Sequence, residues 1–173
     1  MGTKRLLCEW FYPLVGRSAP GTDLYNLWHQ LGVIEGNTFH NHSSFIEYKD
    51  LKGQQVHFYT DIEKLKNHFL EISPEDLKVI DEFVGGIKTF SNNSFPLDKS
   101  FELLNAWDWT KIMFSNFSPI MAMGKFNRIS IKEFAQQFKS EVLRAAFENF
   151  WAPEMTMTFF LMQLAYAYKG TAG

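Results

Sequence analysis

Three histidines are the first candidates for chemistry in this chain of 173 residues. His40 and His42 lie two residues apart in a strand-like run, so their side chains share a face, and His57 lies in the next such run. Imidazole nitrogens are common ligands of zinc. In the expected hairpin, however, His57 falls several residues further along, and no carboxylate completes a compact site. We therefore interpret all three as solvated or hydrogen-bonded histidines and expect no metal ion.

Nucleophilic and acid–base signatures are also missing from the sequence. No serine lies in a nucleophile elbow, and Cys8 has no cysteine–histidine pattern around it. The neighbouring acids Glu75 and Asp76 are explained by capping, because they follow a Ser-Pro pair at a helix start. The glycine pair at 85–86 lacks the strand and the spaced glycines of a phosphate-binding loop, so it predicts close packing or a bend. We therefore expect no catalytic residue in this chain.

Charge and aromatic content narrow the class of protein. Seventeen basic and nineteen acidic residues nearly balance, whereas a nucleic-acid-binding surface would need a basic stripe, so we expect no nucleic acid partner. The chain contains eighteen Phe, six Tyr and five Trp. Because aromatic side chains bury large areas, they indicate either a bulky core with subunit contacts in a homo-oligomer or the lining of an apolar cavity.

The cellular setting is indicated by the cysteine content and by the apolar tracts. A single cysteine excludes an internal disulfide and fits a cytoplasmic protein. The longest apolar tract, residues 155–168, is interrupted by Thr and Gln and is too short to span a bilayer. The methionines are typical core filler, but mobile Met side chains also suit an adaptable apolar binding surface.

A resemblance to a known family rests on the order and spacing of several segments. Residues 14–28, LVGRSAPGTDLYNLW, with Leu31-Gly32 behind them, resemble the segment that follows the FAD-binding motif in phytoene-desaturase-like oxidoreductases. These enzymes are flavoproteins of the amine-oxidase-like superfamily. The likeness continues loosely through the expected hairpin into SIKEFAQQF at 130–138 and ends at 169–173. It spans most of this chain but only the middle of such an enzyme.

The resemblance implies that the chain is the substrate-binding and lid portion of a FAD-dependent oxidoreductase, phytoene dehydrogenase-like, acting on an apolar or amine-like substrate. FAD would be bound by a further domain of the parent protein, which would be the main partner, and this chain alone would be inactive and bind no FAD. Trp10 and Tyr12 would lie near the flavin ring. The helical part would cover the substrate channel and contact membrane lipid peripherally.

The same residues are compatible with two other functions. One is a stand-alone binding module for a lipid or isoprenoid ligand, and the other is a purely structural interaction domain. Neither needs a cofactor.

An antiparallel hairpin is predicted from residues 38–49 and 54–60, joined by a turn at 50–53 in which Gly53 can adopt a positive φ. If Lys49 lies opposite Gln54, cross-strand partners define two faces. One face carries Phe45, Val56 and Phe58. The other carries Ile46, Tyr48, His57 and Tyr59. Because both faces are partly apolar, the hairpin should be covered on both sides or completed by further strands.

Helices are predicted from apolar periodicity and from their caps. Thr60 and Ser130, each followed by Glu three residues later, form capping boxes. Ser140 caps the next helix, and Pro119 interrupts the apolar run 110–123.

The pattern as a whole predicts an α+β fold, with a small antiparallel sheet packed by helices and followed by a mostly helical lobe. We divide it at the Asn/Ser/Pro linker into residues 1–95 and a helical lid of residues 96–173. The lobe should present an apolar groove to the hairpin. The side chains expected to bind substrate are Ile46, Tyr48, Tyr59, Phe114, Phe159 and Phe160.

Overall fold

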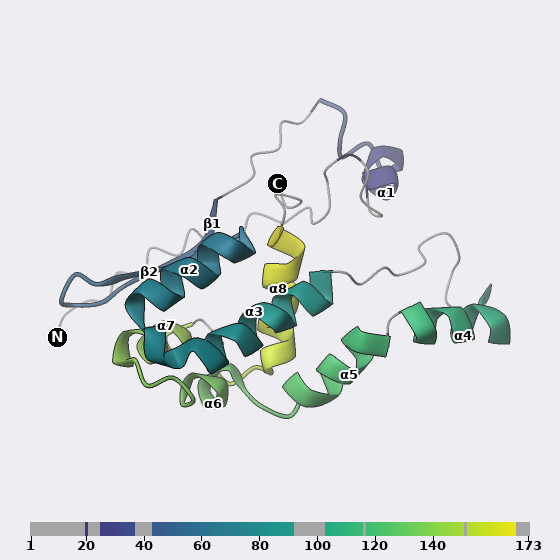
Figure 1. Cartoon of the computed structure of the whole chain (residues 1–173). Coiled ribbons are helices and arrows are strands. Elements are labelled where there is room, and N and C mark those ends of the chain that lie inside the picture. The colour runs from purple at the N-terminus through teal and green to yellow at the C-terminus, as the bar shows by residue number, and fades with distance from the viewer. Residues whose placement is uncertain are drawn as a thin grey trace.

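The computed structural model describes residue 20 and residues 25–36, 43–91, 103–115, 117–150 and 152–168. These residues form a two-stranded antiparallel sheet, eight α-helices and a short 3₁₀ helix (Figure 1). The elements are α1 (Tyr25–Gln30), β1 (Ser44–Lys49), β2 (Gln55–Tyr59), α2 (Ile62–Ile72), η1 (Pro74–Asp76), α3 (Leu77–Ser91), α4 (Ala106–Ser115), α5 (Phe117–Phe126), α6 (Ile131–Ala135), α7 (Glu141–Glu148) and α8 (Met157–Ala167). The expected α+β fold, a small sheet followed by a helical lobe, is confirmed.

A hairpin forms from the predicted segments, of which residues 38–42 lie outside the described residues, but its register differs by one residue. Lys49 lies opposite Gln55, Tyr48 opposite Val56 and Ile46 opposite Phe58. Ile46 and Tyr48 therefore share the core-facing side with Val56 and Phe58, and the predicted assignment of these two residues to the opposite face is wrong. A shift of one residue moves a side chain to the other face, because side chains alternate along a strand.

The turn explains the shift in register. Gly53 adopts φ +86°, as expected, and its N–H donates to the Asp50 carbonyl, while the Asp50 N–H donates to the carbonyl of Gln54. Asp50 thus faces both Gly53 and Gln54, which is a bulge that adds one residue to β2. The Asp50 carboxylate fixes this loop by accepting the N–H groups of Lys52 and Gln54, each at 2.8 Å.

Phenylalanine side chains from β2 and six helices meet in one core. Phe147 is the hub, because its ring centroid lies 5.2 Å from that of Phe58, 5.1 Å from that of Phe83 and 5.6 Å from that of Phe160. All four side chains are almost completely buried. The core also includes Phe69 of α2 and Phe134 of α6. Residues on both sides of the expected boundary at 95–96 therefore share one hydrophobic core.

A glycine lies where α3 and α8 approach closely. A Cβ at Gly86 would lie 2.8 Å from Leu161 Cδ1 and 3.3 Å from the ring of Phe126, so these side chains would have to shift to admit any other residue. Gly85, by contrast, has open space around it. The glycine pair thus serves close packing, as the sequence predicted.

Asp76 joins the first half of the core to the second. Its carboxylate is buried and accepts hydrogen bonds from the N–H groups of Lys139 (2.9 Å) and Ser140 (3.0 Å) and from the Ser73 hydroxyl (2.8 Å). Burial alone would raise the pKa of Asp76, but these three hydrogen bonds outweigh it and hold the pKa below its usual value. Asp76 lies in the first turn that Ser73 opens, as the sequence indicated, but its carboxylate also binds the amides that lead into α7.

The helix starts follow local cap chemistry. Ser130 forms the predicted capping box with Glu133, and Ser140 accepts from the Leu143 N–H. At α2 the cap is Asp61 instead of Thr60, because the Thr60 N–H still donates to the Ser43 carbonyl within the hairpin. The Asp61 carboxylate accepts from the Lys64 N–H at 2.7 Å, and aspartate is among the strongest caps.

Helices α4 and α5 lead away from the core (Figure 1). α4 ends at Ser115 and α5 begins at Phe117, so Pro119, which was expected to interrupt this apolar run, lies in the first turn of α5. Proline is tolerated there because the first amides of a helix have no partner within it. Phe126, at the other end of α5, is buried against the core.

Candidate functional site

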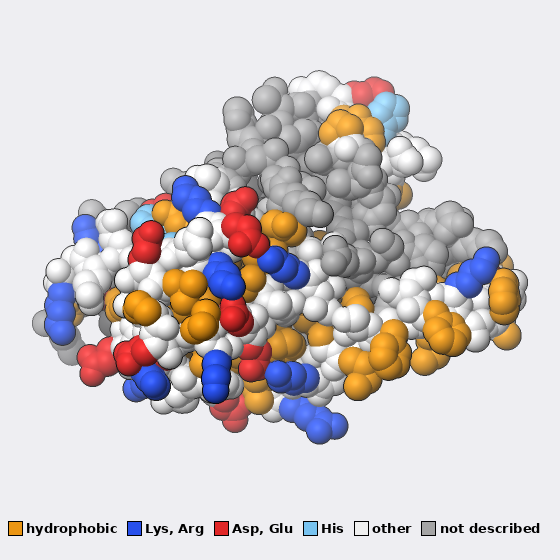
Figure 2. Space-filling model, viewed as in Figure 1, with side chains coloured by type: hydrophobic (Ala, Val, Ile, Leu, Met, Phe, Trp, Pro, Cys, Tyr) orange, Lys and Arg blue, Asp and Glu red, His pale blue; other side chains and the backbone are white. Residues whose placement is uncertain are grey.

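Exposed apolar side chains concentrate in one segment. Of the fourteen large hydrophobic side chains that are exposed among the described residues, nine lie between residues 103 and 123. They are Leu103, Trp107, Trp109, Met113, Phe114, Phe117, Ile120, Met121 and Met123. We call residues 103–123 the aromatic arm. Figure 2 shows hydrophobic side chains gathered over this part of the molecule.

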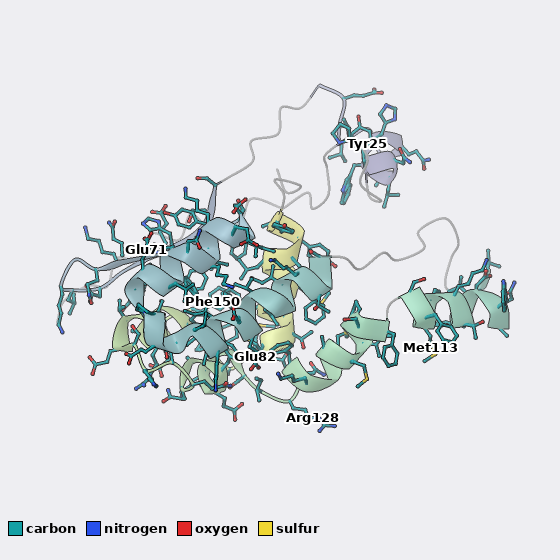
Figure 3. All side chains as sticks on the ribbon, viewed as in Figure 1. Tyr25, Glu71, Glu82, Met113, Arg128 and Phe150 are labelled. Atoms are coloured by element: carbon teal, nitrogen blue, oxygen red, sulfur yellow. The ribbon has the colours of Figure 1, made fainter. Side chains whose placement is uncertain are left out.

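Within the described residues, the aromatic arm contacts the core mainly through its second helix, α5. Within the described residues α4 has no buried side chain, and its main contact is with α5. Helix α5 packs on α3 and α8, where Pro119 and Phe126 are buried and Lys125 Nζ lies 3.0 Å from Glu82 Oε1. Figure 3 shows Met113 on α4, far from Phe150 among the helices of the core. Most side chains of α4 are therefore exposed, while Asp108 and Ile112 are half-buried.

Local interactions make α4 a helix although it buries nothing. Asn105 accepts the Asp108 N–H through its side chain at 2.9 Å, and the Asp108 carboxylate accepts the Asn105 N–H at 3.3 Å. This reciprocal pair acts like a capping box and places an acid near the positive end of the helix. Lys111 Nζ lies 5.8 Å from the ring of Trp107, one turn earlier. Each of these contacts stabilises the helix by only about 1 kcal/mol. Together they do not match the stabilisation that a helix gains by burying an apolar face.

The electrostatics of the arm fit an uncharged partner. Its charged side chains are Asp108 and Lys111, which carry opposite signs. In contrast, the outer surfaces of α2 and α3 carry ion pairs such as Lys66–Asp81 at 2.7 Å and Lys88–Glu63 at 2.7 Å. A ligand with a phosphate or carboxylate would find no basic cluster on the arm, whereas an apolar ligand would lose little solvation of charged groups there.

The predicted substrate-binding residues are not brought together. Phe114 lies on the arm and is 83% exposed. Phe160 is fully buried and its ring lies 4.4 Å from that of Phe150, so it is a core side chain and the expectation that it faces a ligand is wrong. Its neighbour Phe159 is half-buried on α8. The sequence could not separate these two, because α8 is apolar on most of its faces.

The hairpin residues of the predicted groove also separate. Ile46 and Tyr48 pack against the core beside Val56 and Phe58, and burial together with the charge of Asp50 raises the pKa of Tyr48. Tyr59 lies on the other face, where its ring stacks on that of His57 at 5.4 Å. A groove lined by Ile46, Tyr48 and Tyr59 together is therefore not formed.

A shallow pocket lies elsewhere, between the hairpin turn and the start of α7. It encloses about 460 Å³ and is lined by Gln54, Gln55, Glu71, Ile72, Ser140, Glu141 and Val142. None of these is a predicted site residue, and most are polar. We assign it no ligand.

The described residues contain neither a metal-binding cluster nor a membrane-spanning helix. No group of three or more His, Cys, Asp or Glu residues there could hold a metal ion. No helix in the same part of the chain has the length and apolar content needed to cross a membrane. His40 and His42 lie outside the described residues.

The described residues do not fit FAD. Gly85 and Gly86 lie inside α3, and Gly86 is packed against Leu161, so they form no loop for a pyrophosphate. Trp10 and Tyr12, which the resemblance places near a flavin, lie outside the described residues. We therefore derive no chemical step through a flavin.

Comparison of the chain with models of protein families, with curated proteins and with solved structures gives no match. The resemblance carried by residues 14–32 and 130–138 therefore stays a prediction. The aromatic arm, defined by its exposure and contacts, is the candidate site.

Most residues of the arm were missed from the sequence. Phe114 was predicted, but Trp107, Trp109 and Phe117 were not. Two features of the sequence could have indicated the arm. Its apolar helices carry few charges, and its methionines suit an adaptable binding surface as well as a core. Periodicity could not find the arm, because a helix that is apolar on several faces is the pattern of a buried helix.

Proposed function

We propose that this chain is the substrate-binding and lid portion of a phytoene dehydrogenase-like, FAD-dependent oxidoreductase, and that the aromatic arm binds its long apolar substrate. The observation that carries the proposal is that α4 is apolar on several faces and buries none of them. Isolated helices of this length are marginal in water, so α4 is stabilised when an apolar partner covers it. The resemblance of residues 14–32 supplies the flavoprotein context.

The side chains of the arm favour an extended hydrocarbon over a compact polar ligand. Trp107, Trp109, Phe114 and Phe117 are spread along two helices, with methionines between them that can adapt to the ligand. Covering one such aromatic side chain is worth about 2 kcal/mol. Trp107 and Phe114, seven residues apart, share one face of α4, so a ligand that covers both would gain about 4 kcal/mol before the cost of ordering the ligand. An isoprenoid or carotenoid-like chain has the length and the lack of charge to cover such a face.

The remaining parts of the proposal follow from this assignment. The oxidation would be carried out by FAD bound to another domain, which would be the principal partner of this chain. The chain would work in the cytoplasm, peripherally at a membrane that holds the apolar substrate. Its own residues would bind and orient the substrate and exclude water.

The test is binding of geranylgeraniol, measured by competition with an environment-sensitive dye. We expect Trp107→Lys and Phe114→Lys each to weaken binding by about tenfold or more, because each variant removes an aromatic contact and places a charge against hydrocarbon. Both side chains are exposed, so the melting temperature should stay close to that of the wild type.

A matched control is available at the hairpin turn. Leu51 is fully exposed and lies outside the arm, so Leu51→Lys makes a similar change in charge and apolar area without touching the proposed site. The control variant should bind geranylgeraniol as the wild type does. Equal binding by all four proteins, or no binding by any of them, would overturn the proposal.

A further inference from the structure

Among the described residues, the outer edge of β2 is bonded by a histidine and not by a further strand. In an antiparallel pair, residues alternate between those that bond across the ladder and those whose N–H points away from the partner strand. Because Asp50 bonds to Gln54, the alternation makes Glu47 and His57 a non-bonded pair. The His57 N–H therefore points outward, and there it donates to Nε2 of His68 on α2 at 3.0 Å.

This hydrogen bond fixes the tautomer of His68. An imidazole nitrogen that accepts a hydrogen bond carries no proton, so in the neutral ring the proton is on Nδ1. A second proton can then bind only at Nε2, the atom that accepts from His57. Protonation of His68 and the hydrogen bond to β2 are therefore mutually exclusive.

The groups around His68 come from both strands and from α2. The His57 ring lies 5.5 Å from it and the Tyr59 ring 5.4 Å, while Lys64 Nζ lies 4.1 Å from the Tyr59 ring. From β1, Glu47 Oε1 lies 3.3 Å from His57 Nδ1 and so is directed to the other histidine. Glu71 lies one turn after His68 on α2.

Most of these groups disfavour a charge on His68. Burial is the largest effect that lowers its pKa, and His57 and Lys64 lower it further, while Glu71 acts in the opposite direction. The ring is thus neutral at neutral pH and becomes charged only in acid. A group with a lowered pKa stabilises the fold fully above its ordinary pKa, and this contribution is lost as the pH falls below that value.

We propose that His68 is a proton-controlled latch on the free edge of β2, closed when its Nε2 accepts the His57 N–H and opened when that nitrogen is protonated. Opening is local, because Val56 and Phe58 remain buried and hold the strand on the core. It exposes one edge N–H of the hairpin to water or to a carbonyl of another chain, so the device makes the edge of the sheet sensitive to acid.

The tautomer and the hydrogen bond can be followed separately by NMR on the full chain. At about pH 7.5 we expect long-range ¹H–¹⁵N spectra to show Nε2 of His68 unprotonated. From about pH 7.5 to about pH 5, the protection factor of the His57 amide should fall by about tenfold, in step with the His68 titration. The Phe58 amide, which the alternation of the ladder directs toward β1, should keep its protection.

Two variants separate the latch from general loosening in acid. His68→Gln offers an amide oxygen near the position of Nε2 and does not titrate, so the His57 amide should stay protected at both pH values. His68→Phe keeps a ring but no acceptor, so protection should be low at both. A proton on Nε2 at neutral pH, or a His57 amide whose protection does not change while His68 titrates, would overturn the proposal, and both observations need only the wild-type chain.

Discussion

The core and the aromatic arm are built from the same kinds of side chain, yet these have opposite surroundings. Phe160 is fully buried among the rings of four other phenylalanines, whereas Phe114 is 83% exposed. The core elements place charged residues on their outer surfaces, and α4 carries only one acid and one lysine. The difference indicates two uses of apolar side chains within one chain. In the core they determine the fold, and on the arm they remain available to a partner.

The first prediction tests this comparison with one substitution in the core and one on the arm. Phe160→Ala should lower the free energy of unfolding by about 3–5 kcal/mol, because it leaves a cavity among four rings. Phe114→Ala should change it by less than about 0.5 kcal/mol, since an exposed side chain loses few contacts. Denaturant titration of both variants measures the difference. Similar losses in the two would show that the arm is part of the core.

The second prediction concerns Asp76, which joins the two halves of the core. Asp76→Ala should lower stability by about 3 kcal/mol, because it leaves the partly buried N–H groups of Lys139 and Ser140 and the Ser73 hydroxyl without an acceptor. Its neighbour Glu75 is exposed, so Glu75→Ala is the matched control and should cost less than about 0.5 kcal/mol.

The effect of Asp76 should depend on pH. Because its pKa is lowered in the fold, the charged carboxylate stabilises the protein fully above the ordinary aspartate pKa, and this contribution is lost as the pH falls through the lowered value. The stability difference between the wild type and Asp76→Asn should therefore shrink on acidification. A difference that grows in acid would contradict the hydrogen bonding described for this carboxylate.

Local signals predicted the fold well where the chemistry is local. The caps at Ser130 and Ser140, the positive φ of Gly53 and the close packing at Gly86 all depend on residues within a few positions or on the size of one side chain. The predicted register is wrong because a bulge at Gly53 adds one residue to β2. The same turn residues are compatible with a loop with or without that bulge, so the sequence does not decide between them.

The candidate site was less predictable than the fold. The apolar runs of α4 and α8 look alike in sequence, but α8 lies in the middle of the core and α4 does not. Which run is covered depends on the arrangement of α3, α5 and α8, and this involves residues far apart in the chain. The role of Asp76 was missed for the same reason, since its partners lie about sixty residues later.

The most direct measurement of the central claim is the fluorescence of the arm itself. In a chain with Trp10, Trp28 and Trp151 replaced by Phe, Trp107 and Trp109 are the remaining tryptophans. If the arm binds an apolar ligand, adding geranylgeraniol should move their emission to shorter wavelength and saturate, because the rings pass from water into hydrocarbon. Emission that keeps its wavelength while geranylgeraniol binds would place the ligand elsewhere and contradict the account.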